Sequence, residues 1–221
     1  RLSARFGSRE QACEQLHIDG MAHVDAAYIG PSPDAPEGEA ANYWGVRTKP
    51  VYYEGGVYNE QCFNPLAAAR TVDDVEAYAW PTTEWFDYSL MRERAAALRE
   101  MQVVQCGYMA PFYFHNNLRG LELSLMDPLD DPDLAHHIVN RICDFFYDHH
   151  QRMFEACDGL IDVAQVTDDL GAQTGPLISL ELYREFYAPH HKRFIDLCKA
   201  FGILVLHHDD GSIRPFLPDL V

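Results

Sequence analysis

Three short runs of apolar residues in the second half of the chain each stop at a group of polar residues. The runs at 102–107, 160–166 and 203–206 have the length and composition of buried strands. Charged residues follow two of these runs directly, at Asp168-Asp169 and at 207–210. Charge at the end of a buried strand must be solvated, paired or bound to a ligand. We therefore predict parallel strands whose polar ends converge on one site.

Helical patterns separate these predicted strands. The longest, at 133–157, repeats apolar residues mostly at steps of three and four. Ser179 is placed to cap a further helix that is interrupted or restarted at Pro189 and ends at Gly202. Other helices are predicted at 71–80, 85–99 and 117–126, and from about 213. Strands alternating with helices predict a parallel sheet, and both a doubly wound sheet and a (β/α)8 barrel fit this order. In both folds ligands bind at the carboxyl ends of the strands.

The first 70 residues show a different pattern. It predicts a helix at 2–17, a strand at 23–29, a proline-rich loop at 31–40 and a β-hairpin with arms at 43–53 and 57–63. The Gly55-Gly56 pair suits the tight turn of that hairpin. We predict a single domain over 1–221, with 1–70 as the N-terminal helix, loop and hairpin region and 71–221 as the βα units. Because a full barrel needs about 250 residues, we expect an incomplete barrel that missing segments or a partner would close.

The composition predicts a folded, acidic protein. Hydrophobic residues make up 48% of the 221 positions, which is enough for a sizeable core. The net charge of −17 disfavours nucleic acid and anionic membranes as partners. The sequence has no apolar run long enough to predict a membrane span. Six cysteines without a C-x-x-C motif favour free thiols in a reducing, cytoplasmic setting.

Five motifs lie at the predicted strand ends and in two of the predicted helical regions. They are Gly-Tyr-Met-Ala-Pro-Phe at 107–112, Thr-Asp-Asp-Leu-Gly-Ala-Gln-Thr-Gly-Pro-Leu-Ile-Ser at 167–179, Leu-Tyr-Arg-Glu-Phe at 182–186, His-Asp-Asp-Gly at 208–211 and Tyr-Ala-Trp-Pro at 78–81. Together these motifs resemble those of the uroporphyrinogen decarboxylase superfamily. The resemblance covers about 70–221 of this chain. It implies an α/β fold, a (β/α)8 TIM barrel only partly covered by this chain, with the site at the carboxyl ends of the strands.

The resemblance implies two alternative chemistries. One branch of the superfamily decarboxylates the acetate side chains of uroporphyrinogen without a cofactor and holds the substrate carboxylates with paired arginines near the amino terminus. This sequence shows no such arginine motif. The other branch transfers methyl groups between small methylated compounds and a corrinoid or thiol, and uses zinc held partly by a His-x-Cys-Gly strand end. Here Asp210 stands at the thiolate position, and a carboxylate is a harder ligand that also suits Mg or Mn.

The metal ligands and catalytic groups are expected at these strand ends. His208 and Asp210 lie two residues apart, so both side chains point to the same face of a strand, and we predict that they bind a divalent metal, with zinc as the first expectation. The alternative is a His–Asp pair that orders the loop. We predict catalytic roles for Asp168, Asp169 and Tyr108. Adjacent carboxylates raise each other's pKa, which suits proton transfer, although Asp-Leu-Gly is also typical of a turn.

A small, partly apolar substrate is expected to bind beside these groups. An aromatic loop over 108–116 would line the pocket or pack over the barrel mouth. The residues predicted to contact substrate are Phe112, His115, Asn116, Gln173 and His207. Three adjacent histidine pairs, His136-His137, His149-His150 and His190-His191, fall in helical patterns. Because neighbours on a helix do not face the same side, we predict that these pairs lie at the surface or at an interface.

The function predicted first is metal-assisted methyl transfer from a small methylated substrate to a corrinoid, with a corrinoid protein as partner. A homodimer is left open. The alternatives are a cofactor-free decarboxylase of the uroporphyrinogen type and a barrel that binds a ligand without turnover.

Overall fold

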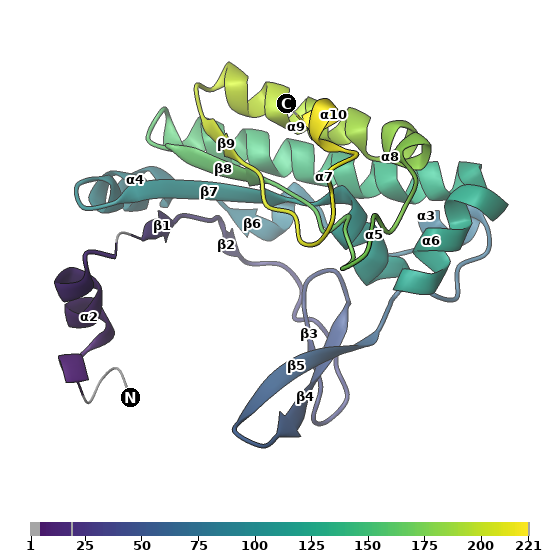
Figure 1. The fold of residues 1–221 in the computed structure, drawn as a ribbon, viewed down its shortest axis with the longest axis horizontal. Coiled ribbons are helices and arrows are strands. Elements are labelled where there is room, and N and C mark those ends of the chain that lie inside the picture. Colours follow the sequence, from purple (N-terminus) through teal and green to yellow (C-terminus); the bar gives the residue numbers. More distant parts are fainter. Residues whose placement is uncertain (1–4, 19, 221) are drawn as a thin grey trace.

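A four-stranded parallel sheet forms the centre of the molecule. The structure is a computed structural model that describes residues 5–18 and 20–220. The strands are β1 (Met21–His23), β7 (Val103–Met109), β8 (Val163–Val166) and β9 (Leu204–Leu206), in the order β1-β7-β8-β9. Gln105 pairs with Val163, which pairs in turn with Leu204. The three strands predicted at 102–107, 160–166 and 203–206 and their parallel arrangement are therefore confirmed, and Figure 1 shows β7, β8 and β9 running in one direction. The single strand predicted at 23–29 is wrong, because β1 ends at His23 and the next strand begins at Ala27 in a different sheet.

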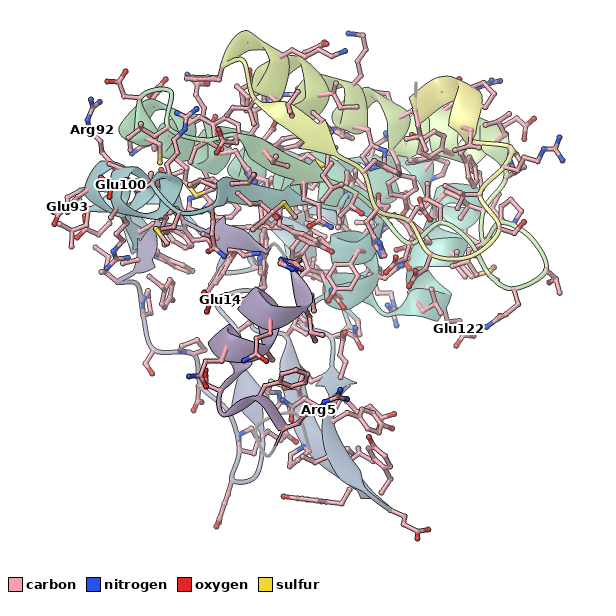
Figure 2. The ribbon with its side chains drawn as sticks, turned by 60° about the vertical axis from the view of Figure 1, so that its left-hand side comes forward. Arg5, Glu14, Arg92, Glu93, Glu100 and Glu122 are labelled. Carbon is pink, nitrogen blue, oxygen red and sulfur yellow. The ribbon has the colours of Figure 1, made fainter. Side chains whose placement is uncertain are left out.

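Helices cover one face of this sheet. The long α7 (Pro132–Cys157) and α9 (Ala188–Ala200) lie along the strands (Figure 1), and α4 (Met91–Arg99) packs against α7 and β7. Helix α4 buries Met91 and presents Arg92 and Glu93 to solvent (Figure 2). The opposite face of the sheet leaves Leu204 71% exposed. In a (β/α)8 barrel the helices lie outside the strands, so the helix-covered face corresponds to the outer surface of the barrel. No helix among the described residues is long and apolar enough to cross a membrane.

Strands of the N-terminal region take part in two small antiparallel sheets. Strand β2 (Ala27–Tyr28) pairs with β6 (Phe86–Asp87), and β3 (Ala40–Ala41), β4 (Arg47–Tyr53) and β5 (Gly56–Phe63) form the other sheet. The predicted hairpin is confirmed as β4–β5, which projects away from the main sheet (Figure 2). Its base is tied to the main body because Gln61 donates a 2.8 Å hydrogen bond to the Asn117 carbonyl. Helix α2 (Arg9–Leu16) begins at the Ser8 cap, and 2–4 of the predicted helix lie outside the described residues.

Several element boundaries differ from the prediction. The helix predicted at 85–99 starts only at Met91, because Phe86 and Asp87 pair with β2. The predicted aromatic loop over 108–116 is wrong. Helix α5 (Pro111–Arg119) begins there, and Pro111 suits its first turn because that position needs no backbone N–H donor. Helix α6 (Leu121–Asp130) follows directly after Gly120.

The remaining helices lie close to the predicted positions. Thr71 caps α3 (Val72–Glu76), and Ser179 caps α8 (Leu180–Phe186) by accepting a 3.2 Å hydrogen bond from Leu182 N. Pro189 lies in the first turn of α9, so it starts a helix and does not kink one. Helix α10 (Leu217–Leu220) begins a few residues after the predicted position.

His149 and His150 on α7 are buried, which corrects the prediction of a surface pair. The His150 Nδ1 donates to the Phe146 carbonyl at 2.6 Å, and its Nε2 accepts from Tyr108 N at 3.0 Å. The ring lies against Gly107, whose φ is +89° at the point where the β7 register shifts. A Cβ at Gly107 would lie 2.5 Å from this ring. His150 therefore stabilises the irregularity in β7 at which the pairing register with β8 shifts.

Burial makes His150 a source of acid sensitivity. It lowers the pKa of His150 to about 4, whereas the unfolded chain takes up this proton near pH 6.5. Between these values the unfolded state binds more protons, so the free energy of unfolding falls as the pH falls. We expect His150 alone to contribute a loss of roughly 2 kcal/mol between pH 7.5 and pH 5. Urea unfolding at both pH values should show a smaller loss for His150→Gln than for the wild type, and equal losses would contradict this role.

Candidate metal and catalytic site

The loops after β8 and β9 touch at the carboxyl edge of the sheet. The Thr167 hydroxyl and the Asp168 N–H both donate to the His208 carbonyl, the latter at 3.2 Å. A Cβ on Gly211 would lie 2.5 Å from the Gly171 carbonyl carbon, and Gly211 has a φ of +84°. Both the contact and the backbone conformation require glycine at position 211. This close approach brings the polar residues of the two loops together.

Asp169, His208 and Asp210 form a cluster with one donor atom each, all within 4.8 Å of one another. The His208 Nε2 lies 3.5 Å from Asp169 Oδ1 and 3.7 Å from Asp210 Oδ1. Asp169 Oδ1 is buried and has no hydrogen-bond partner among the described residues. One imidazole nitrogen and two carboxylate oxygens are ligands that divalent metals accept, so this donor set fits a metal. The structure thus adds Asp169 to the predicted pair of His208 and Asp210.

Asp168 turns into the protein, away from this cluster. Its side chain is fully buried and accepts hydrogen bonds from Phe112 N at 3.0 Å and Tyr113 N at 2.8 Å, in the first turn of α5. The His191 Nε2 of α9 lies 2.9 Å from Asp168 Oδ2, although the ring is not aligned for an ideal hydrogen bond. Burial raises the pKa of Asp168, while His191 and the two N–H groups act in the opposite direction. Its position is that of a buried anchor between β8, α5 and α9.

Tyr108 and Gln173 lie at the surface near the strand ends. Tyr108 lies near the end of β7 with 40% of its surface exposed, beside the ring of Tyr113. Burial of the rest of its side chain raises the pKa of Tyr108 to about 12. Gln173 is exposed in the tight loop closed by pairing of Gly171 with Pro176. Both side chains are therefore accessible to a ligand that approaches the strand ends.

Phe112 and His115 belong to α5, and their rings point from this helix into the core. Both are fully buried, and both rings pack against Tyr187. The His115 Nδ1 lies 2.9 Å from the Tyr187 hydroxyl, and burial lowers the pKa of His115 to about 4. Asn116 is half-buried and accepts a hydrogen bond from Ser124 of α6. The helical conformation of this segment places these side chains against protein, not solvent.

His207 is half-buried between the two loops. Its Nδ1 lies 2.7 Å from the Val166 carbonyl, and its Nε2 lies 3.7 Å from Asp209 Oδ2. Burial opposes the charged ring, but Asp209 and the Val166 carbonyl outweigh it, so the pKa of His207 is raised. Asp209 Oδ1 also accepts a 2.8 Å hydrogen bond from Leu170 N. His207 and Asp209 therefore join the loops from the side opposite to His208 and Asp210.

His191 was predicted at the surface or at an interface, and this is wrong, because it is buried beside Asp168 together with Tyr183 of α8, which the sequence interpretation did not single out. The Tyr183 hydroxyl lies 3.0 Å from His191 Nδ1, and both side chains are almost fully buried. A signal was present, because His191, Phe194 and Cys198 follow each other at steps of three and four and so lie on one helix face. The last two are buried as well. The adjacent pair His190-His191 concealed this periodicity.

The comparisons with known proteins agree with this architecture. The model of the uroporphyrinogen decarboxylase (URO-D) family matches residues 65–221, so the chain belongs to that family. Its fold is similar to that of a methyltransferase from Methanosarcina mazei, with a TM-score of 0.54 and 17% identity. The match covers 73% of this chain and 46% of that one, so this chain spans less than half of its structural relative. No curated protein matches the chain.

The contact between Gly171 and Gly211 can be tested with alanine. Gly211→Ala places a side chain against the Gly171 backbone at a positive φ, so we expect it to lower the free energy of unfolding by about 2 kcal/mol or more. Gly38 has the same φ of +84°, but a Cβ added there would meet no atom within 4 Å, so Gly38→Ala should cost only about 1 kcal/mol. Urea unfolding of both variants measures the difference. Equal costs would show that the loops do not need this contact.

Proposed function

We propose that this chain carries the metal-binding part of a methyltransferase of the URO-D family. The enzyme would move a methyl group from a small methylated substrate to a corrinoid that a partner protein presents. The observation that carries the proposal is the convergence of Asp169, His208 and Asp210 at the carboxyl ends of β8 and β9. The similarity in fold to a methyltransferase supports it. The cluster is accessible to ligands and lies at the carboxyl ends of the strands, where the active sites of (β/α)8-barrel enzymes are found.

Asp169, His208 and Asp210 would hold the metal. A bound divalent cation would supply Lewis-acid polarisation of the substrate heteroatom. Zinc remains the first expectation from the family, but the donor set contains no thiolate and consists of harder ligands. Tyr108 would contact the substrate beside the metal. Because its pKa is about 12, its hydroxyl keeps its proton at neutral pH and can donate a hydrogen bond.

Decarboxylation of a porphyrinogen is the alternative, and the arginine contacts do not decide against it, because Arg214, three residues after Gly211, is exposed and forms no ion pair with a described residue. That reaction needs cationic side chains to hold several substrate carboxylates. In the part of the chain that follows β7, Arg119, Arg184 and Arg193 are each paired with an aspartate of the protein, at Asp127, Asp219 and Asp144. These pairs leave the three guanidinium groups engaged. The activity test described below therefore distinguishes decarboxylation from methyl transfer.

Metal binding tests the cluster directly. We expect one Mn²⁺ or Zn²⁺ per chain in equilibrium dialysis with metal analysis, and His208→Ala should weaken binding by about 100-fold or more, since even residues behind the ligands change affinity 10–100-fold. Asp210→Cys restores a thiolate, which is a softer ligand, so the Zn²⁺ affinity should rise relative to Mn²⁺ by about tenfold or more. Asp130→Cys, at an exposed position at the end of α6, is the matched control and should leave the ratio unchanged. Wild-type protein that binds neither ion would refute the metal site.

Activity distinguishes the two reactions. The purified protein should methylate a reduced corrinoid from a panel of methoxy, methylamino and methylthio compounds, detected by the absorbance change of the corrinoid. Chelation and His208→Ala should each reduce the rate by about 100-fold or more. Uroporphyrinogen turnover that is insensitive to chelators, with no corrinoid methylation, would support the decarboxylase instead. Inactivity in both assays despite a loaded metal site would support the non-catalytic alternative.

A further inference from the structure

We infer that His191 on α9 is a positioning residue for the metal cluster and that it acts through Asp168. This inference rests on the proposed metal site, and it assigns a role to a buried histidine that does not itself reach the cluster. The contacts form a chain from Tyr183 to His191, from His191 to Asp168, and from Asp168 to the loop that carries Asp169.

The first step is the anchoring of Asp168. The N-cap of α5 is Ala110, which offers no side-chain acceptor for the free N–H groups of the first turn. Asp168 supplies the acceptors from another element, with one oxygen to Phe112 N and the other to Tyr113 N. A carboxylate at this place also interacts favourably with the positive end of the helix dipole. The end of β8 is thereby fixed to the start of α5.

The second step is the contact with His191. Its imidazole is 2% exposed and places Nε2 2.9 Å from Asp168 Oδ2. A buried carboxylate needs a partner that compensates its lost hydration, and the imidazole nitrogen is close enough to do so electrostatically, although the ring is not aligned for an ideal hydrogen bond. Tyr183 contacts the other ring nitrogen and so holds the orientation of the ring. His191 therefore limits the conformations that the Asp168 side chain adopts.

The third step links Asp168 to the cluster. Asp169 is the only member of the cluster on the β8 loop, while His208 and Asp210 both follow β9. The fit of the three donors therefore depends on how the β8 loop is placed against the β9 loop. Asp168 controls this placement at both ends, because its side chain binds α5 and its N–H donates to the His208 carbonyl. If Asp168 loses its partner on α9, Asp169 is held less firmly opposite His208.

The chain offers a matched pair of tyrosines to test this role. Tyr183 and Tyr187 lie one helical turn apart, both are fully buried, and each hydroxyl contacts a buried histidine. Only the histidine that contacts Tyr183 also contacts Asp168. Tyr183→Phe and Tyr187→Phe therefore remove equivalent groups from the core. A purely structural effect should lower the melting temperature of both variants and leave their metal affinities alike.

The experiment is a Mn²⁺ titration of the purified full chain, followed by the electron paramagnetic resonance signal of free Mn²⁺. We expect His191→Leu to weaken binding by about tenfold or more, as for residues that orient metal ligands, and His191→Gln, whose amide can donate to Asp168, to stay within about threefold of wild type. Tyr183→Phe should weaken binding by about threefold or more, and Tyr187→Phe should leave it unchanged. Thermal melting establishes that each variant is folded.

The outcomes separate this inference from the proposed function. Wild-type binding with unchanged affinity in folded His191→Leu and in Tyr183→Phe would overturn the positioning role and leave the metal site intact. Equal losses in the two tyrosine variants would overturn it as well. If His191→Leu does not fold, the comparison of Tyr183→Phe with Tyr187→Phe decides. Wild-type protein without Mn²⁺ or Zn²⁺ binding would overturn the metal site and the inference together.

Discussion

The buried carboxylate of Asp168 joins the elements that meet at the carboxyl edge of the sheet. The carboxylate accepts hydrogen bonds from two backbone N–H groups of α5 and contacts His191 on α9. Asp168 follows β8 directly in the chain, and its own backbone N–H donates to the His208 carbonyl in the loop after β9. A buried carboxylate with this many partners is costly to displace, because each lost contact leaves a charge without compensation. At the edge of the sheet where ligands would bind, the contacts of Asp168 therefore hold the buried side of the β8 loop, and Asp169, His208 and Asp210 lie on its accessible side.

The sequence predicted the elements whose side chains follow a regular period. Strands β7, β8 and β9, the long helix α7 and the β4–β5 hairpin all lie close to their predicted positions. Helix α5 was missed because its aromatic and asparagine residues suggested a loop, and Pro111 at its start was the available signal. Burial of His150 and His191 was also missed. His150 contacts Tyr108, which lies 42 residues away in the sequence. His191 contacts Asp168, which lies on a different element.

In the candidate site, too, the sequence predicted what depends on local spacing and did not predict what depends on contacts between distant elements. The spacing of His208 and Asp210 was enough to place them together, because both follow one strand. The sequence did not distinguish Asp168 from Asp169, since both are aspartates at the end of β8. The structure separates them: the first turn of α5 and the imidazole of His191 hold Asp168 inside, and Asp169 then faces His208. This choice depends on tertiary packing, which no local pattern reports.

The central claim is that Asp169, His208 and Asp210 together bind one divalent metal. Anomalous X-ray diffraction from crystals of the protein grown with Mn²⁺, recorded above and below the manganese edge, tests it most directly. We expect one strong anomalous peak between these three side chains, at about 2.2 Å from their donor atoms. A map without a peak at this position, or with the metal bound elsewhere, would contradict the claim.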